Sequence, residues 1–220
     1  MATIKGTSDT DNILGLQGDD IILAGRGNDS IDGGGGNDRI FADYGDDLIN
    51  GGEGDDSLFG EHGNDIVNGG AGSDRVSGGR GDDLGIYRLA DNQGSADYYD
   101  GGEGSDTLRL ILTHEQASSG PILAEIEAFR QFLKQNQRPD GADNPTFHFS
   151  TFGLAARNWE NVEVVVEPPA QLPVVAISDA TVTEGDPGGT NATIEFTVRR
   201  TGDNGTASTV IYTATPGTAT

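Results

Sequence analysis

The chain has 220 residues, with 36 Asp and Glu against 13 Lys and Arg, a formal net charge of −23, 35 Gly and no Cys. This balance argues against a nucleic-acid partner, because phosphate binding requires clustered Lys and Arg. The lack of Cys excludes a disulfide framework, a thiolate nucleophile and Cys-ligated metal sites. No apolar run approaches the roughly 18 residues of a membrane span, and the first 20 residues hold no apolar signal-peptide segment.

A nine-residue repeat runs without a gap from Gly6 to Ile86, and a further unit, 101–109, follows a 14-residue insertion. The sixth position of every unit is Asp: Asp11, Asp20, Asp29, Asp38, Asp47, Asp56, Asp65, Asp74, Asp83 and Asp106. The eighth position is aliphatic except at Gly85. The fourth is Gly except at Asp9, and includes Gly18, Gly27, Gly36, Gly45, Gly54, Gly63, Gly72 and Gly81.

One inward aliphatic residue per short strand, after a glycine-rich turn, is typical of a β-solenoid and does not fit a helix. Stacked strands place the turn aspartates about 4.8 Å apart, where their charges repel. Ca²⁺ resolves this conflict, because it binds six to eight carboxylate and carbonyl oxygens. The repeat therefore predicts a mainly all-β chain with a parallel β-roll over residues 1–109 that binds calcium.

These units resemble the RTX, or hemolysin-type, family of calcium-binding β-rolls, whose signature is G-G-x-G-x-D-x-U-x. The resemblance implies that two units make one turn. Several Ca²⁺ ions then lie between alternate repeats, held by the sixth-position Asp residues and by carbonyls of the glycine turns. The first such pair of units carries Asp9 in place of a turn glycine.

The 18-residue period also predicts two outward apolar ladders. One consists of Leu23, Phe41 and Phe59, and the other of Leu48, Ile66 and Leu84. Because contiguous exposed apolar patches usually mark contacts, we expect a downstream segment to cover at least one ladder. The alternative is that these residues are scattered surface hydrophobes.

Residues 110–167 are predicted to cap the roll, which as a solenoid must shield its last core layer. Residues 86–89 and 107–112 are predicted strands, with an acidic loop at 90–100. A helix is expected over 121–137, because Ile122, Ile126, Phe129 and Leu133 are spaced 4, 3 and 4 residues apart. Two strands are expected, at 146–152 and 161–167, around a core of Phe147, Phe149, Phe152 and Trp159. This segment resembles what often follows the repeats in bacterial RTX proteins.

A Pro-rich linker is predicted at 168–173. Residues 174–220 alternate in strand fashion, with a hairpin turn at 203–205. They resemble the first half of a Calx-β domain, a β-sandwich that needs roughly 100 residues, so we expect the sequence to be the N-terminal part of a longer protein. Glu184 and Asp186 are candidate calcium ligands by the same resemblance, with an ordinary acidic loop as the alternative.

No catalytic motif is present, and His62, His114 and His148 are isolated from one another in the sequence. We therefore expect a non-enzymatic module. The RTX resemblance implies a secreted or surface-associated bacterial protein, exported by type I secretion machinery and folding in external calcium, with cell-surface or matrix components as possible contacts. The alternatives are the non-catalytic region of a secreted protease or lipase, part of an adhesin, and a calcium buffer with no partner.

Overall fold

The computed structural model describes residues 1–136 and 144–168 in full and the backbone of residues 175–182, 192–200 and 208–214. The chain divides into two compact units, Met1–Pro168 and Pro169–Thr220. None of the helices in the described part of the chain is long and apolar enough to cross a membrane.

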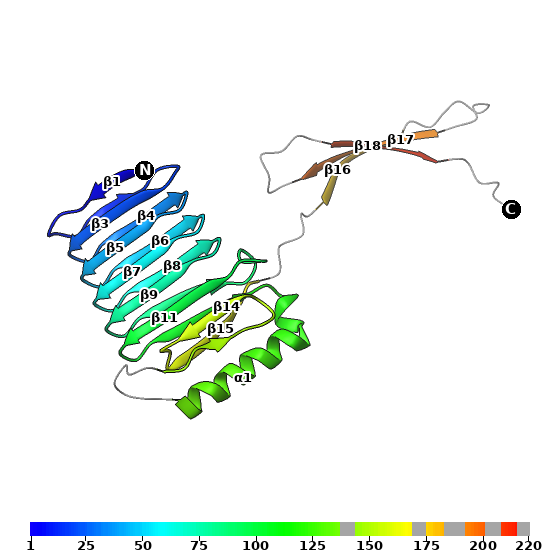
Figure 1. Ribbon diagram of the computed structural model, residues 1–220. Coiled ribbons are helices and arrows are strands. Elements are labelled where there is room, and N and C mark those ends of the chain that lie inside the picture. The colour runs from blue at the N-terminus through cyan, green and yellow to red at the C-terminus, as the bar shows by residue number, and fades with distance from the viewer. Residues whose placement is uncertain (137–143, 169–174, 183–191, 201–207, 215–220) are drawn as a thin grey trace. The chain divides into compact units, whose positions relative to one another are not determined.

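In the first unit, each nonapeptide forms one strand, and successive strands alternate between two sheets in which the repeat strands pair in parallel (Figure 1). The eight-stranded sheet has the order β1 (Ala2–Lys5), β3 (Asp20–Arg26), β5 (Arg39–Tyr44), β7 (Ser57–His62), β9 (Arg75–Arg80), β11 (Asp97–Glu103), β14 (Leu154–Arg157) and β13 (Phe147–His148). The seven-stranded sheet has the order β15 (Asn161–Val166), β12 (Thr107–Leu112), β10 (Leu84–Arg88), β8 (Ile66–Ala71), β6 (Leu48–Glu53), β4 (Ser30–Gly35) and β2 (Asn12–Leu14). The predicted β-roll is confirmed.

The strand register follows the predicted period of two units. Ile40 pairs with Leu58 in one sheet, and Ile31 pairs with Ile49 in the other, 18 residues apart in each case. The eighth-position side chains of both sheets face inward and form the core between them, with Ile40, Ile49 and Leu58 fully buried. One short strand, β1, precedes the first unit and pairs with β3, which the repeat alone did not predict.

The exception at Gly85 has a packing reason. Gly85 pairs with Val67 and with Leu108, two core residues of the neighbouring strands. A Cβ atom added to Gly85 would lie 2.5 Å from Cη2 of Trp159, which is buried and donates its indole N–H to the Tyr99 carbonyl. The Trp159 ring thus takes the space that an aliphatic side chain fills in the other units.

The prediction of a 14-residue insertion before the last unit is wrong. The Asp74 and Asp97 positions of adjacent turns are 23 residues apart, where 18 is the rule, so five residues are inserted. Residues 97–100, expected to be loop, are part of β11 and continue the eight-stranded sheet. The repeat pattern did not reveal the unit 92–100, because Ser95 replaces the usual Gly at its fourth position and Tyr99 replaces the usual aliphatic residue at its eighth.

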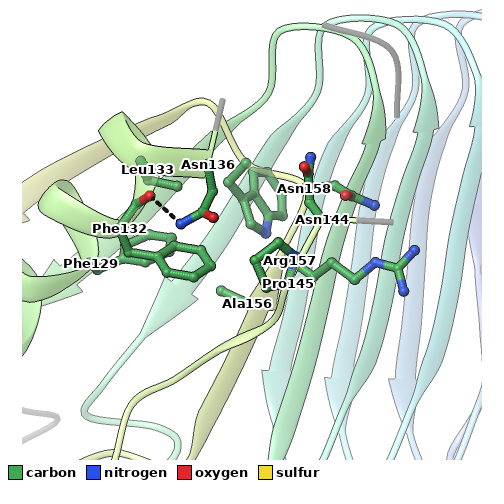
Figure 2. Close-up of a pocket in the computed structure, with 10 residues that line it drawn as sticks. Phe129, Phe132, Leu133, Asn136, Asn144, Pro145, Ala156, Arg157 and Asn158 are labelled. Carbon is green, nitrogen blue, oxygen red and sulfur yellow. Dashed lines mark hydrogen bonds between the residues drawn. The ribbon is translucent and has the colours of Figure 1, made fainter. Parts of the chain in front are cut away.

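The cap is built around α1 (Gly120–Asn136), preceded by the 3₁₀ turn η1 (Gln116–Ser118). The predicted apolar face is confirmed, since Ile126, Phe129 and Leu133 are buried and Ile122 packs against the core. Figure 2 shows Phe129, Phe132 and Leu133 gathered near Ala156 of β14. The cavity between them measures only about 10 Å³, so the contact is filled by side chains.

Two details of the cap differ from expectation. The segment 146–152 forms only the two-residue strand β13. The strand β14, which pairs in parallel with β11, was not predicted. Phe147, Phe149 and Phe152 do join an aromatic cluster with Phe129, whereas Trp159 lies inside the roll under Gly85. The strand expected at 161–167 is confirmed as β15.

Both predicted outward ladders are present, but residues 1–136 and 144–168 cover neither of them. Leu23, Leu48 and Ile66 are 37%, 50% and 38% exposed. Within the first unit, the expectation of a downstream cover is therefore wrong for residues 110–136 and 144–168, because α1 and its neighbouring strands pack on the end of the roll and not on its faces.

The second unit contains the antiparallel strands β16 (Val175–Val182), β17 (Ala192–Arg200) and β18 (Ser208–Ala214), in that order. The register between β16 and β17 shifts between Ile177 and Ala180. The linker and the hairpin turn predicted at 168–173 and 203–205, and the acidic residues Glu184 and Asp186, fall almost entirely outside the described residues.

Candidate metal centre

The sixth-position aspartates form two columns, one along each edge of the roll where the chain turns from one sheet to the other. One column consists of Asp11, Asp29, Asp47, Asp65, Asp83 and Asp106, and the other of Asp20, Asp38, Asp56, Asp74 and Asp97. Within a column, each backbone N–H donates to Oδ1 of the aspartate one turn later; for example, Asp47 N–H donates to Asp65 Oδ1 at 2.8 Å. All members except Asp11 are buried.

The second oxygen of most of these carboxylates has no hydrogen-bond partner. This group of buried Oδ2 atoms belongs to Asp29, Asp38, Asp47, Asp56, Asp65, Asp74, Asp83 and Asp106. Buried polar atoms in folded proteins are nearly always paired, because leaving one unpaired costs about 1–3 kcal/mol. Eight unpaired carboxylate oxygens in two regular columns are therefore a donor set that suits a cation.

Glycines at two positions make room for this arrangement. A Cβ atom at the first-position Gly33 would lie 2.6 Å from Asp38 Oδ2 of the same unit. At the fourth position, Gly18, Gly27, Gly36, Gly45, Gly54, Gly63, Gly72 and Gly81 all have φ between 112° and 136°, a region that residues with a Cβ atom avoid. A Cβ atom on Gly63 would also collide with the Gly45 carbonyl of the preceding turn, so glycine at this position lets the turns stack closely.

The electrostatics point the same way. Burial, opposed in part by the backbone N–H bond and reinforced by neighbouring carboxylates, raises the pKa of Asp56, Asp65, Asp74 and Asp106 to about 7. The same causes raise the pKa of Asp47 and Asp83 to about 6. Without a cation, the columns hold their charge at neutral pH only against a free-energy penalty.

Carboxylates alone do not complete a site. Among the residues that the structure describes, no three acidic or histidine side chains converge into a metal-binding group. The donors that each turn offers are instead one or two buried carboxylates together with carbonyl oxygens. Oxygen ligands of this mixed kind suit Ca²⁺, a hard cation that accepts flexible coordination by carboxylates and carbonyls.

The ends of the columns differ from their middle. Asp11 Oδ2 accepts the Thr7 N–H at 2.6 Å, and Asp20 Oδ2 accepts the Leu16 N–H at 2.9 Å, so both carboxylates are already satisfied. At the other end, Glu160 Oε2 accepts the Asp106 N–H at 2.8 Å and thereby takes the place of a further aspartate. The first and last turns thus close the columns with the chain's own hydrogen bonds.

Sequence reasoning missed two features of the site. Asp97 is a column member, only 2% exposed, and its position nine residues before Asp106 was the available signal. The fifth position forms a second, exposed ladder in which the side chain accepts the backbone N–H of the equivalent residue one turn later, as Asp46 does from Asn64 at 2.8 Å. The recurrence of Asn, Asp or Ser at this position could have indicated it.

Comparison with known families agrees with this geometry. Residues 5–40, 32–67, 41–76, 58–84 and 93–108 match the RTX calcium-binding nonapeptide repeat. The nonapeptide array thus matches the RTX repeat over most of its length. A search of curated proteins found no match to the chain.

The RTX match extends to residues 93–108 and so includes Asp97, in agreement with its place in the column. The histidines, by contrast, lie outside both columns. His62 stacks on Tyr44 with ring centroids 4.6 Å apart, His114 precedes η1, and His148 lies in β13.

Proposed function

We propose that the RTX roll of this protein binds several Ca²⁺ ions along its two aspartate columns and folds as it binds them. The observation that carries this proposal is the set of eight buried Oδ2 atoms without a hydrogen bond. When bound, Ca²⁺ supplies the positive charge that the columns lack.

The chain's own groups have distinct roles in this proposal. The carboxylates of Asp29, Asp38, Asp47, Asp56, Asp65, Asp74, Asp83 and Asp106 bind the ions through Oδ2, while Oδ1 fixes each side chain to the preceding turn. The fourth-position glycines, from Gly18 to Gly81, admit the turn conformation and contribute carbonyl oxygens. Asp11, Asp20 and Asp97, whose Oδ2 atoms already accept hydrogen bonds, are weaker ligands.

We further propose that this module works outside the cell, in a secreted or surface-associated bacterial protein exported by a type I-like route. Low cytosolic calcium then leaves the acidic, glycine-rich chain unfolded, and external calcium folds it, because an ion that binds only the folded state stabilises that state by mass action. The three antiparallel strands β16, β17 and β18 are consistent with part of a Calx-β sandwich at 174–220, which we also propose.

The test starts from the full chain after thorough chelation and adds Ca²⁺ in steps, with Mg²⁺ as the control ion. Far-ultraviolet circular dichroism measures the secondary structure at each step. We expect a cooperative gain of β signal with Ca²⁺ and none with Mg²⁺, and native mass spectrometry should show several bound ions. A chain that is already folded after chelation, or that responds equally to Mg²⁺, would contradict the proposal.

A further inference from the structure

A cavity of about 540 Å³ lies between the cap and the loop that joins β10 to β11. Residues 89 and 92–95 of that loop form one wall, and Gln116, Ile122 and residues 150–153 form the other. This volume falls within the range of roughly 300–1,000 Å³ that is usual for small-molecule sites. Because the two walls are separate in the sequence, the cavity forms only when the cap folds onto the roll.

The cavity is uncharged, although the chain carries a net charge of −23. No Asp, Glu, Lys, Arg or His is among the described residues that line it. The carboxylates bonded to its walls are already satisfied. Glu125 accepts the backbone N–H and the hydroxyl group of both Ser150 and Thr151. Asp97 Oδ2 accepts the Ser95 hydroxyl at 2.8 Å. A charged ligand would therefore lose its hydration here without gaining a counter-ion.

Two glutamine side chains supply free hydrogen-bonding groups to the cavity. Gln116 Oε1 accepts the Thr113 N–H at 2.9 Å, which fixes the side chain. Its NH₂ group has no acceptor among the described residues, and the Gln93 amide forms no hydrogen bond with any of them. One wall thus offers a held donor pair, and the other offers an amide that both donates and accepts.

Asn92 adds an acceptor from the buried side of the cavity. It is only 3% exposed, and its Nδ2 donates to the Arg88 carbonyl at 3.2 Å. The Ser95 hydroxyl lies 3.4 Å from Asn92 Oδ1, but its single proton goes to Asp97 Oδ2, which is closer at 2.8 Å. Within the described chain, Asn92 Oδ1 is thus a buried acceptor that lacks a well-placed donor, and a ligand hydroxyl would supply one.

The floor of the cavity is apolar, and the backbone beside it is already paired. Leu89 and Phe152 are only 3% and 8% exposed. The Phe152 carbonyl accepts the Tyr87 hydroxyl at 2.6 Å. The Gly153 carbonyl accepts the Asp97 N–H at 2.9 Å. A peptide recognised through its main chain needs free backbone groups on the protein, so this wall does not suit one.

We propose that this cavity binds a neutral sugar. A sugar ring carries hydroxyl groups that each donate and accept, and it presents apolar C–H faces. The amides of Gln93 and Gln116 and the Asn92 carbonyl oxygen match the hydroxyl groups. The Leu89 and Phe152 side chains match a C–H face. An apolar lining with a few polar groups that fix the ligand's orientation is the usual composition of a small-molecule site.

The test is saturation-transfer difference NMR of the full chain in millimolar calcium, with glucose, galactose and mannose as probes. We expect at least one of them to receive saturation. Its uronate, which carries a carboxylate in place of the hydroxymethyl group, should bind at least about tenfold more weakly, because the cavity offers no counter-ion. The methyl glycoside separates two sources of the ligand: equal binding identifies the end of a glycan, and lost binding identifies a free sugar.

Three variants connect binding to the cavity. Gln93→Ala/Gln116→Ala should weaken binding at least about tenfold, the scale of two lost hydrogen bonds. Gln93→Leu, which breaks no hydrogen bond of the described chain, should weaken it without disturbing the fold. Gln131→Ala is the matched control, because that amide lies on α1 outside the cavity and bonds Glu127.

The proposal would be overturned by a folded chain that binds none of the three sugars, by uronates that bind equally well, or by unchanged binding in Gln93→Leu. Circular dichroism with and without calcium is recorded on the same samples, so a failure of calcium-dependent folding is recognised separately.

Discussion

At the scale of single residues, the aspartate columns show how one side chain serves two purposes. Oδ1 of an aspartate such as Asp83 accepts the backbone N–H of the preceding turn, while Oδ2 of eight column aspartates has no hydrogen-bond partner and is the calcium ligand in the proposed function. An amide can replace the first function but not the second. This separation allows a substitution that tests metal binding with little change to the turn itself.

We predict that Asp65→Asn weakens calcium binding and lowers stability in calcium by about 1–3 kcal/mol, the scale of a lost buried polar interaction. After chelation at pH 5, where protonated columns favour the fold, the same variant should be about as stable as the wild type, because Asp65, whose pKa is raised to about 7, carries no charge in the fold at that pH. Urea unfolding with and without calcium measures both effects. Asp55→Asn, at the exposed fifth position, is the matched control and should change neither; a loss of stability for Asp65→Asn in chelator at pH 5 would contradict the prediction.

The fourth-position glycines are required for two reasons that one pair of variants can separate. Gly18 and Gly63 have φ of 132° and 133°, but an added Cβ atom meets nothing within 4 Å at Gly18 and collides with the Gly45 carbonyl at Gly63. Gly18→Ala should therefore cost about 1–2 kcal/mol from the positive φ alone. Gly63→Ala should cost clearly more, and thermal unfolding in calcium measures the difference. Equal losses would mean that the carbonyl contact is unimportant.

At the scale of elements, Trp159 joins the cap to the repeat array. It belongs to the cap in sequence but fills the eighth-position space of the ninth unit. The cap is therefore packed into the interior of the roll as well as against its end, and Gly85 is the complementary half of that contact.

We predict that Trp159→Ala destabilises the roll by about 3–5 kcal/mol, the usual cost of a large cavity. Gly85→Val alone should also destabilise, because its side chain collides with the ring. The double variant should recover part of the loss, since Val restores the aliphatic column between Val67 and Leu108. Unfolding followed by circular dichroism gives the coupling energy, and strictly additive losses would exclude the direct exchange of one side chain for the other.

The sequence predicted this fold where residue identity and period agree. The strands of the nine contiguous units follow from one aliphatic position, because a slip of one residue would turn the whole column outward. The columns of buried aspartates follow from the same period. β11 was missed because Ser95 and Tyr99 interrupt the pattern, although Asp97 keeps the nine-residue phase. β14 consists of only Leu154–Arg157, and its place is set by contact with β11 rather than by a local signal.

At the scale of the whole molecule, the columns link folding to pH. The aspartates that have a folded-state pKa of about 6 to 7 have an ordinary value of 3.8 when exposed. The folded chain therefore binds more protons than the unfolded chain between these values. The stability that this supplies is present at acidic pH and is lost as the pH rises towards about 7.

We predict that the fold of the chelated chain loses stability as the pH rises from 5 to 8, so that β signal present at pH 5 is absent at neutral pH, where the proposed function has the chelated chain unfolded. The loss is about 1.4 kcal/mol per pH unit for each aspartate that is protonated in the fold and ionised in the unfolded chain. In calcium the slope should reverse, because protons compete with the ion for the same oxygens. Urea titrations in calcium, and circular dichroism in chelator across the same pH range, measure the two trends; trends of the same sign would show that protons and calcium do not share a site.

Every turn within the contiguous units adds the same 18 residues, so the number of turns can change while the two ends of the roll stay the same. Strands of neighbouring turns pair at an offset of 18 residues throughout the contiguous units, so residues 42–59 could be removed and the remaining strands would meet in the same register. Each such step shortens the stack by about 4.8 Å and removes one member from each column. Gain or loss of whole turns is thus a route by which such a molecule changes its reach and its ion capacity together, while its first strand and its cap stay as they are.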